Sequence, residues 1–138
     1  MSLTNYGAQA LLNSLFGKTS NFGALASAPD LFLAASTTTP AEDGTNITEP
    51  SGNNYSRLDV SGSDFDGATL ADPSEIDNTG TLSFATASGS WGTITHIVAM
   101  DASSGGNAIV VYALSASKTI GASDTLEFAA GDLSLTLD

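Results

Sequence analysis

The only histidine and the only tryptophan of the chain, His96 and Trp91, lie five positions apart in the segment Ser88–Met100, SGSWGTITHIVAM. A histidine that meets a serine and one of the 15 acidic residues could form the catalytic triad of a hydrolase. Such a triad needs a nucleophile on a sharp turn, and the sequence has no G-x-S-x-G motif. Strand alternation places His96 on one face with Ile94 and Val98, which are core-type side chains. We therefore predict a structural histidine and no catalytic residue.

Trp91 and the acidic residues indicate two further kinds of site. The indole of Trp91 could stack on a sugar, or it could close the end of a β-barrel or sandwich. The acidic segment 61–78, which includes Asp64 and Asp66, could offer oxygen ligands to calcium, but its spacing matches no calcium-binding loop. We therefore predict a structural Trp91, a long acidic loop over 61–78, no metal site and no cofactor. A carbohydrate-binding module, with Trp91 or Tyr55 as the stacking surface, stays open as an alternative.

The composition argues against several classes of partner. With 15 acidic residues and three basic ones, the chain has a formal net charge of −12, which repels phosphate backbones and anionic membrane surfaces. The sequence has no cysteine, so disulfides and thiolate metal sites cannot form. No apolar run reaches the roughly 18 residues of a transmembrane helix. We expect no nucleic-acid partner and no membrane partner, and the length of 138 residues favours one domain over 1–138.

The hydrophobic pattern predicts an all-β fold with one short N-terminal helix. Apolar residues at spacings of three and four predict a helix over 3–16 that Gly17 ends. The run Leu31–Ala35, LFLAA, is typical of a buried strand. Further short apolar segments, separated by Gly, Asp, Ser and Asn, predict six or seven strands in a mainly antiparallel β-sandwich or barrel. The segment Asp101–Ala108, DASSGGNA, is typical of a hairpin loop.

One predicted strand, Ala108–Leu114 or AIVVYAL, is apolar on both faces. Ile109, Val111 and Ala113 lie on the face opposite to that of Tyr112. In a small sandwich only one face meets the core, so the second face needs cover from a helix, a loop or another subunit. We predict a subunit interface at this second face and a homo-oligomer, with a trimer as the expected state.

Much of the chain resembles a family of small tailed-phage virion proteins that are often named tail fibre proteins. The family pattern contains an S-G-G-G-Y-x-R segment, a W-G-T-x-T-H strand, an aspartate and glycine hairpin, an A-L-x-x-x-K-T strand and a closing A-A-G-x-L strand. The chain departs from this pattern at Asn53 and Asn54, which stand in place of glycines. The matching residues are Ser51, Gly52, Tyr55, Arg57, Trp91–His96, Asp101–Gly106, Ala113, Leu114, Lys118, Thr119 and Ala129–Leu133.

The resemblance implies a non-enzymatic structural protein of the virion. It implies that Tyr55, Arg57, Trp91 and His96 form a structural signature and not a catalytic site. A chain of this length supplies one compact domain, which favours a small accessory part over a complete fibre. We therefore expect a capsid cement or decoration protein on the head surface, bound to the major capsid protein. A tail fibre or baseplate accessory protein, bound to tail proteins, stays open as the alternative.

Overall fold

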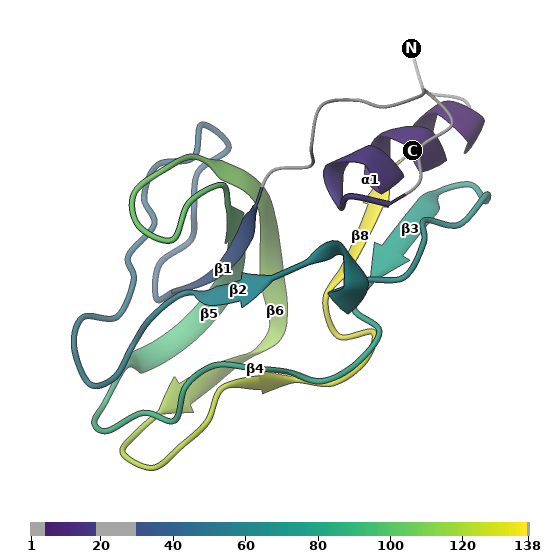
Figure 1. The fold of residues 1–138 in the computed structure, drawn as a ribbon. Coiled ribbons are helices and arrows are strands. Elements are labelled where there is room, and N and C mark those ends of the chain that lie inside the picture. The colour runs from purple at the N-terminus through teal and green to yellow at the C-terminus, as the bar shows by residue number, and fades with distance from the viewer. Residues whose placement is uncertain (1–4, 19–29, 138) are drawn as a thin grey trace. The chain divides into compact units, whose positions relative to one another are not determined.

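The computed structural model describes residues 5–18 and 30–137 (Figure 1). Within these residues there are one α-helix and eight strands, which confirms the prediction of an all-β fold with one short helix. No helix in this part of the chain is long and apolar enough to cross a membrane. The elements are α1 (Asn5–Leu15), β1 (Leu31–Ser36), β2 (Leu58–Val60), β3 (Ser74–Asp77), β4 (Leu82–Ser83), β5 (Gly92–Met100), β6 (Ala108–Ile120), β7 (Glu127–Phe128) and β8 (Ser134–Leu137).

The chain divides into two compact units. Among the described residues, the first unit contains 5–18, 61–82 and 128–137, and the second contains 30–60 and 83–127. Each unit is made of several chain segments, so the division does not decide whether the two fold as one domain. The single β-sandwich domain over 1–138 stays a prediction.

The segment 61–78 differs from the acidic loop that the sequence predicts. It contains a 3-10 helix, Gly62–Asp64, and strand β3, which pairs antiparallel with β8. In β3 the side chains of Ser74 and Ile76 are buried while Glu75 is exposed. This alternation extends over only four residues and includes two acidic ones, so it is too short to identify a strand by pattern.

In the first unit, α1 packs on β3 and β8. The helix ends as the sequence predicts, because Gly17 takes a left-handed φ of 66°. Residues 3 and 4 of the predicted helix lie outside the described residues. The buried ring of Phe16 meets Phe65 edge-on, with centroids 4.4 Å apart.

A buried asparagine, Asn78, organises the chain beside β8 in the same unit. Its side-chain amide donates to the carbonyls of Gly80 and Ala129 at 2.7 and 2.8 Å. Its oxygen accepts the Leu133 amide at 2.9 Å. The closing A-A-G-x-L segment is therefore held by one side chain from a distant part of the sequence.

The second unit is built on a four-stranded sheet in the order β2-β1-β5-β6 (Figure 1). The run LFLAA becomes β1, which pairs with both β2 and β5 and is buried along most of its length, as predicted. Apolar side chains cover both faces of the sheet around β1 and β5. One face carries Leu33, Ala35 and Ile97, and the other carries the buried cluster of Ala34, Val98 and Met100, with Phe32, Ile47 and Ala108 packed against it.

A hairpin joins β5 to β6, as the sequence predicts. Its loop turns at Gly105 and Gly106, whose φ angles are 62° and 74°. The Asp101 carboxylate accepts the backbone amide and the side-chain amide of Asn107 at 2.6 and 2.8 Å. Two register shifts interrupt the pairing of β5 with β6, and between them Val110–Ala113 keep a regular antiparallel register.

Candidate functional site

The segment that begins the family pattern forms a left-handed turn in the loop between β1 and β2. Gly52, Asn53 and Asn54 have φ angles of 68°, 52° and 64°. Glycine adopts this region freely, and asparagine is one of the few other residues that tolerate it. The two asparagines can therefore keep a turn that glycines form in the pattern.

Side chains from this turn fasten it to the segment that leads into β5. The amide of Asn53 donates to the Ser90 carbonyl and that of Asn54 to the Thr86 carbonyl, both at 2.9 Å. A Cβ atom at Gly89 would lie 2.6 Å from the side-chain oxygen of Asn53. A side chain at Gly89 would therefore displace the Asn53 amide from this place.

Trp91 is buried where the chain enters β5. The residue is 4% exposed, and its indole Nε1 donates to the Asn53 carbonyl at 2.9 Å. Its ring meets Tyr55 edge-on at a centroid distance of 5.1 Å and meets Phe84 at 6.3 Å. A ring enclosed in this way has no free face on which a sugar could stack.

An ion pair joins Arg57 to Glu49. Arg57 Nη2 lies 2.6 Å from Glu49 Oε1, and Nε donates to the two carboxylate oxygens at 3.2 and 3.1 Å. Burial raises the pKa of the Glu49 carboxyl, but hydrogen bonds from Arg57 and Tyr55 and the charge of Arg57 outweigh burial, so the pKa lies below its ordinary value. The hydrogen bond with Glu49 raises the pKa of Arg57. Both groups are therefore charged at neutral pH.

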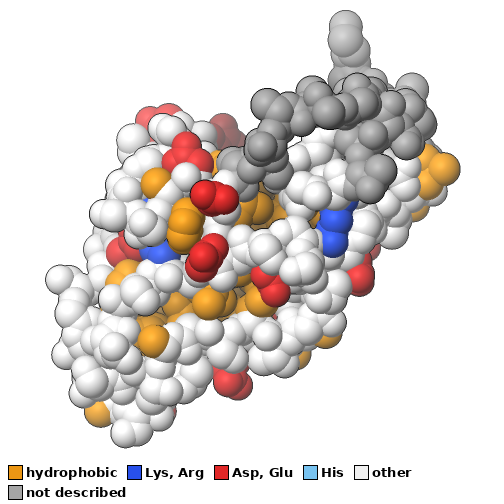
Figure 2. Space-filling model, in the orientation of Figure 1, with side chains coloured by type: hydrophobic (Ala, Val, Ile, Leu, Met, Phe, Trp, Pro, Cys, Tyr) orange, Lys and Arg blue, Asp and Glu red, His pale blue; other side chains and the backbone are white. Residues whose placement is uncertain are grey.

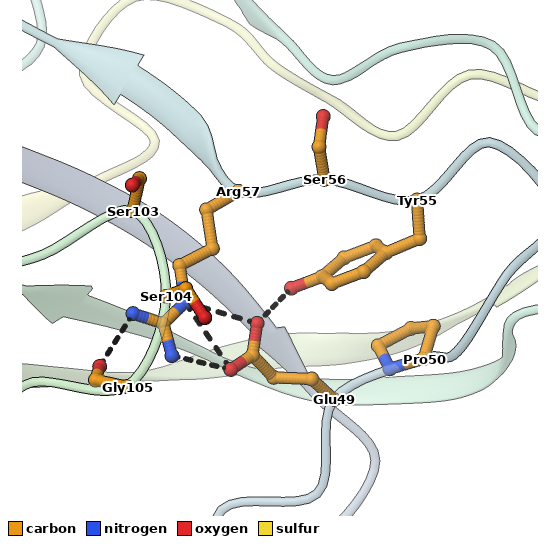
Figure 3. Close-up of a pocket in the computed structure, with 8 residues that line it drawn as sticks. All are labelled: Glu49, Pro50, Tyr55, Ser56, Arg57, Ser103, Ser104 and Gly105. Atoms are coloured by element: carbon orange, nitrogen blue, oxygen red, sulfur yellow. Dashed lines mark hydrogen bonds and ion pairs between the residues drawn. The ribbon is translucent and has the colours of Figure 1, made fainter.

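The same guanidinium also binds the β5–β6 hairpin. Arg57 Nη1 donates to the carbonyls of Ala102 and Gly105 at 2.6 and 2.8 Å. The Arg57 side chain is 7% exposed, and it reaches the exposed tip of the hairpin at Gly105. One arginine therefore connects the start of β2, the loop at Glu49 and the tip of the hairpin (Figure 3).

Tyr55 completes this group, and we call Glu49, Tyr55 and Arg57 the loop cluster. The Tyr55 hydroxyl donates to Glu49 Oε2 at 2.7 Å and accepts the Ala35 amide of β1 at 2.9 Å. Burial and the neighbouring Glu49 carboxylate raise the pKa of Tyr55. The hydroxyl therefore stays protonated and acts as a fixed donor.

An open pocket of ≈ 380 Å³ lies at the loop cluster (Figure 3). Among its lining residues the charged side chains are Glu49 and Arg57, which already bind each other. A bound pair of this kind is neither a free base nor a free acid. The arrangement fits a brace between loops better than a reaction centre. The lining residues are Glu49, Pro50, Tyr55, Ser56, Arg57, Ser103, Ser104 and Gly105.

The structure brings three of the four predicted signature residues together, but not the fourth. Tyr55 contacts Trp91, and both lie in the same network as Arg57. His96 is half-buried, and its Nδ1 lies 2.9 Å from the hydroxyl of Thr95. Among the described residues no hydrogen bond or ring contact joins His96 to the other three.

The strand neighbour of His96 on β1 is Ser36, which raises the question of a serine and histidine pair. Ser36 is fully buried, its hydroxyl donates to the Thr38 carbonyl at 2.8 Å, and it accepts the Thr48 amide at 3.2 Å. The hydroxyl is thus engaged with the backbone, and no substrate could reach it.

The predicted interface residues lie on β6 with different exposures. Val111 is 42% exposed, Ala113 is exposed and Ile109 is half-buried. In the part of the chain that the structure describes, no three His, Cys, Asp or Glu side chains come together in a group that could hold a metal ion.

Glu49 is the functional residue that sequence reasoning misses. A signal for it exists, because Glu49 opens the segment EPSGNNYSR, which also contains Arg57. A buried arginine needs a partner of opposite charge, and a carboxylate near it in the sequence can be that partner. With 15 acidic residues to choose from, however, no pattern in the sequence selects this one.

The comparisons with known proteins agree with the resemblance seen in the sequence. A family model described as podophage GP4 fiber I protein gp80 matches residues 2–136, which is nearly the whole chain. No curated protein matches the chain. The matched range includes the left-handed turn, the loop cluster, Trp91 and the β5–β6 hairpin. The chain therefore belongs to the podophage GP4 fiber I protein gp80 family.

Proposed function

We propose that this chain is a non-enzymatic part of a phage tail fibre. Its family makes it a structural protein of the phage virion. The observation that carries the finer proposal is the family match over residues 2–136, whose description names a fibre protein. This supports the tail-fibre alternative over the head-cement role and head-surface location that the sequence favours.

The loop cluster supports a structural role. Loops lack the regular hydrogen-bond ladders of strands, so side chains that bind their backbone groups help to hold them in one shape. Here Arg57 holds the hairpin tip through two carbonyls, and Tyr55 links Glu49 to the backbone of β1. These polar groups thus hold parts of the same chain together. This supports a protein that presents rigid surfaces to its neighbours.

The non-enzymatic part of the proposal rests on His96 and its surroundings. Its nearest strand neighbour with a hydroxyl nucleophile, Ser36, is buried and bound to the backbone. We expect purified protein to release no reducing sugar from host surface polysaccharide. Activity that His96→Ala abolishes while the variant keeps its melting temperature would contradict the proposal.

The position on the virion is tested by labelling. Intact particles are incubated with gold-labelled antibody to the purified chain and imaged, and a particle reconstruction gives the number of copies. We expect label at the tail and a copy number set by the tail symmetry. Label spread over the head would support the cement interpretation instead. Particles with neither label nor peptides of this chain would show that the chain is not part of the virion.

The partners that we propose are tail or baseplate proteins. Particles that lack this chain should bind the purified protein at the tail until the sites saturate. The same binding is measured with Arg57→Met, a variant that loosens the hairpin tip. Binding to tail-less heads at the same level would contradict a tail partner.

A further inference from the structure

Aspartate followed by glycine is a sequence context in which the peptide bond rearranges readily. The backbone nitrogen of the glycine can reach the side-chain carboxyl of the aspartate, because glycine has no Cβ that would crowd the approach. The chain contains two such pairs, Asp43 with Gly44 and Asp66 with Gly67, which we call the 43–44 step and the 66–67 step. The same local sequence thus occurs in two structural surroundings.

Hydrogen bonds occupy both reacting groups of the 43–44 step. Asp43 Oδ1 accepts the hydroxyl and the backbone amide of Thr45 at 2.6 and 3.0 Å. The Gly44 amide donates to the Ala41 carbonyl at 3.0 Å. The bonds from Thr45 also lower the pKa of the Asp43 carboxyl, which reduces the fraction of its protonated form. Ring closure needs a protonated carboxyl and a free amide, so this step is blocked at both groups.

The reacting groups of the 66–67 step are free. Both residues are exposed and lie outside helices and strands. Within the part of the chain that the structure describes, no hydrogen bond or ion pair reaches the Asp66 carboxylate or the Gly67 amide. A Cβ atom added to Gly67 would have nothing within 4 Å, so the space around it is open. Acidic side chains are spread over the visible face of the molecule (Figure 2), and the free amide beside Asp66 is what distinguishes this one.

We propose that the 66–67 step of the folded protein converts slowly to isoaspartate, while the 43–44 step does not. The Gly67 nitrogen forms a bond to Asp66 Cγ and loses its proton, the protonated carboxyl loses its hydroxyl group, and the two leave as water. The product is a succinimide ring. Water then adds either at Cγ, which restores aspartate, or at the backbone carbonyl carbon of Asp66, which breaks its bond to the Gly67 nitrogen and leaves isoaspartate. The water lost is regained, and nothing is oxidised or reduced.

Isoaspartate adds one backbone carbon between two anchored positions of the first unit. The Asp66 amide donates to the Asp77 carbonyl at 2.9 Å. Further along, the Ala68 amide donates to Asn13 Oδ1 of α1 at 2.8 Å, and the Ala68 carbonyl accepts the side-chain amide of Gln9 at 2.9 Å. A longer backbone cannot keep both anchors in place, so isomerisation should loosen Ala68 from α1. This modification concerns the chain itself and does not depend on the fibre role.

Ageing of the purified protein tests the proposal. Folded samples and samples unfolded in guanidinium chloride are kept for weeks at mildly acidic pH in water enriched in a heavy oxygen isotope. Each ring that opens takes up the isotope, peptide mapping by mass spectrometry locates it, and an isoaspartyl methyltransferase measures the isoaspartate formed. In the folded protein we expect label and isoaspartate at Asp66 and none at Asp43. In the unfolded chain we expect them at both, because the bonds from Thr45 are lost.

Gly67→Val is the matched variant, because two heavy atoms on its Cβ crowd the reacting nitrogen. Gly67 has no left-handed φ and open space around it, so valine fits, and the label at Asp66 should fall to background. The proposal would be overturned by folded wild type without label at Asp66, by equal label at Asp43, by an unfolded chain in which Asp43 stays unlabelled, or by undiminished label in Gly67→Val. The isoaspartate fraction, separated by chromatography, should melt below the unmodified fraction, and equal melting would overturn the loosening of α1.

Discussion

Two tyrosines of the second unit, Tyr55 in the loop cluster and Tyr112 on β6, lie in regions that are stabilised in different ways. Burial raises the pKa of both hydroxyl groups. The Tyr55 hydroxyl has two partners, Glu49 and the Ala35 amide. The Tyr112 hydroxyl is buried without a hydrogen-bond partner among the described residues. The loop cluster is thus stabilised by hydrogen bonds and an ion pair, while β6 is stabilised by apolar packing and by the backbone hydrogen bonds of its pairing with β5.

The difference follows from what the backbone can do in each place. Strand β6 satisfies the amides and carbonyls that face β5 along its ladder, so side chains are not needed to bind them. The loops at Glu49 and at the hairpin tip have no ladder, so Arg57 and Tyr55 must bind them. Side chains hold the loops together, whereas β6 is held by its pairing with β5 on one side. The two regions therefore keep their shape by different kinds of bond.

Removal of Arg57 should have the largest effect on the loop cluster. Arg57→Met removes the guanidinium from the Glu49 carboxylate, which keeps only the Tyr55 hydroxyl, and removes the donor to the carbonyls of Ala102 and Gly105. Breaking a buried ion pair costs about 3–5 kcal/mol, and the partial exposure of Glu49 favours the lower end of this range. Urea unfolding followed by circular dichroism measures the loss. Arg57→Met combined with Glu49→Gln is the matched control and should recover part of it. A loss of free energy of unfolding below about 1 kcal/mol is typical of an exposed ion pair, and it would contradict a buried pair of Arg57 and Glu49.

Acid should weaken the same cluster to a smaller extent. The folded pKa of Glu49 lies below its ordinary value of 4.5, so its carboxylate stabilises the fold above that pH, and this contribution is lost as the pH falls through the folded pKa. Other acidic residues also titrate, so the measured quantity is the difference between the wild type and Glu49→Gln. The free energy of unfolding should fall more steeply for the wild type between about pH 5 and pH 3. Parallel curves for the two proteins would mean that the Glu49 carboxyl has the same pKa in the folded and the unfolded state.

The two tyrosines should respond differently to the loss of a hydroxyl. Tyr55→Phe removes a bond to a carboxylate and one to a backbone amide, which should cost about 2 kcal/mol in free energy of unfolding. Tyr112→Phe removes no bond and should be neutral or stabilising by up to about 1 kcal/mol. Thermal and urea unfolding of the two variants measure both effects. Equal losses would show that the Tyr112 hydroxyl is hydrogen-bonded.

A methyl group at Gly89 should have the smallest measurable effect. Gly89→Ala forces the Asn53 side chain to move and to lose its bond to Ser90, which should cost about 1 kcal/mol. Gly67→Ala is the matched control, because nothing lies within 4 Å of its added Cβ. In a chain that already carries Asn53→Gly, the same Gly89→Ala change should cost much less, because the side chain and its bond to Ser90 are already absent. An equal cost in the two backgrounds would show that the contact between these two positions is not what requires the glycine.

The sequence by itself determined the features that depend on a few neighbouring residues. The buried strand β1, the hairpin at Gly105 and Gly106 and the end of α1 at Gly17 were all predictable, because apolar runs and left-handed glycines act locally. The resemblance also identified Tyr55, Arg57, Trp91 and His96 as one signature, and the first three of these meet in the structure. Short strands in acidic surroundings were not predictable, as β3 shows.

Only the tertiary structure decided which distant groups meet. Arg57 binds carbonyls 45 and 48 residues further along the chain, and Asn78 binds Ala129 and Leu133 51 and 55 residues away. Such bonds leave no periodic signal, since each side chain has many partners of the same type available. The position of β6 at the edge of the sheet has the same origin. The residues Ile109, Val111 and Ala113 could be read as apolar from the sequence, but which of them is exposed depends on the strand order.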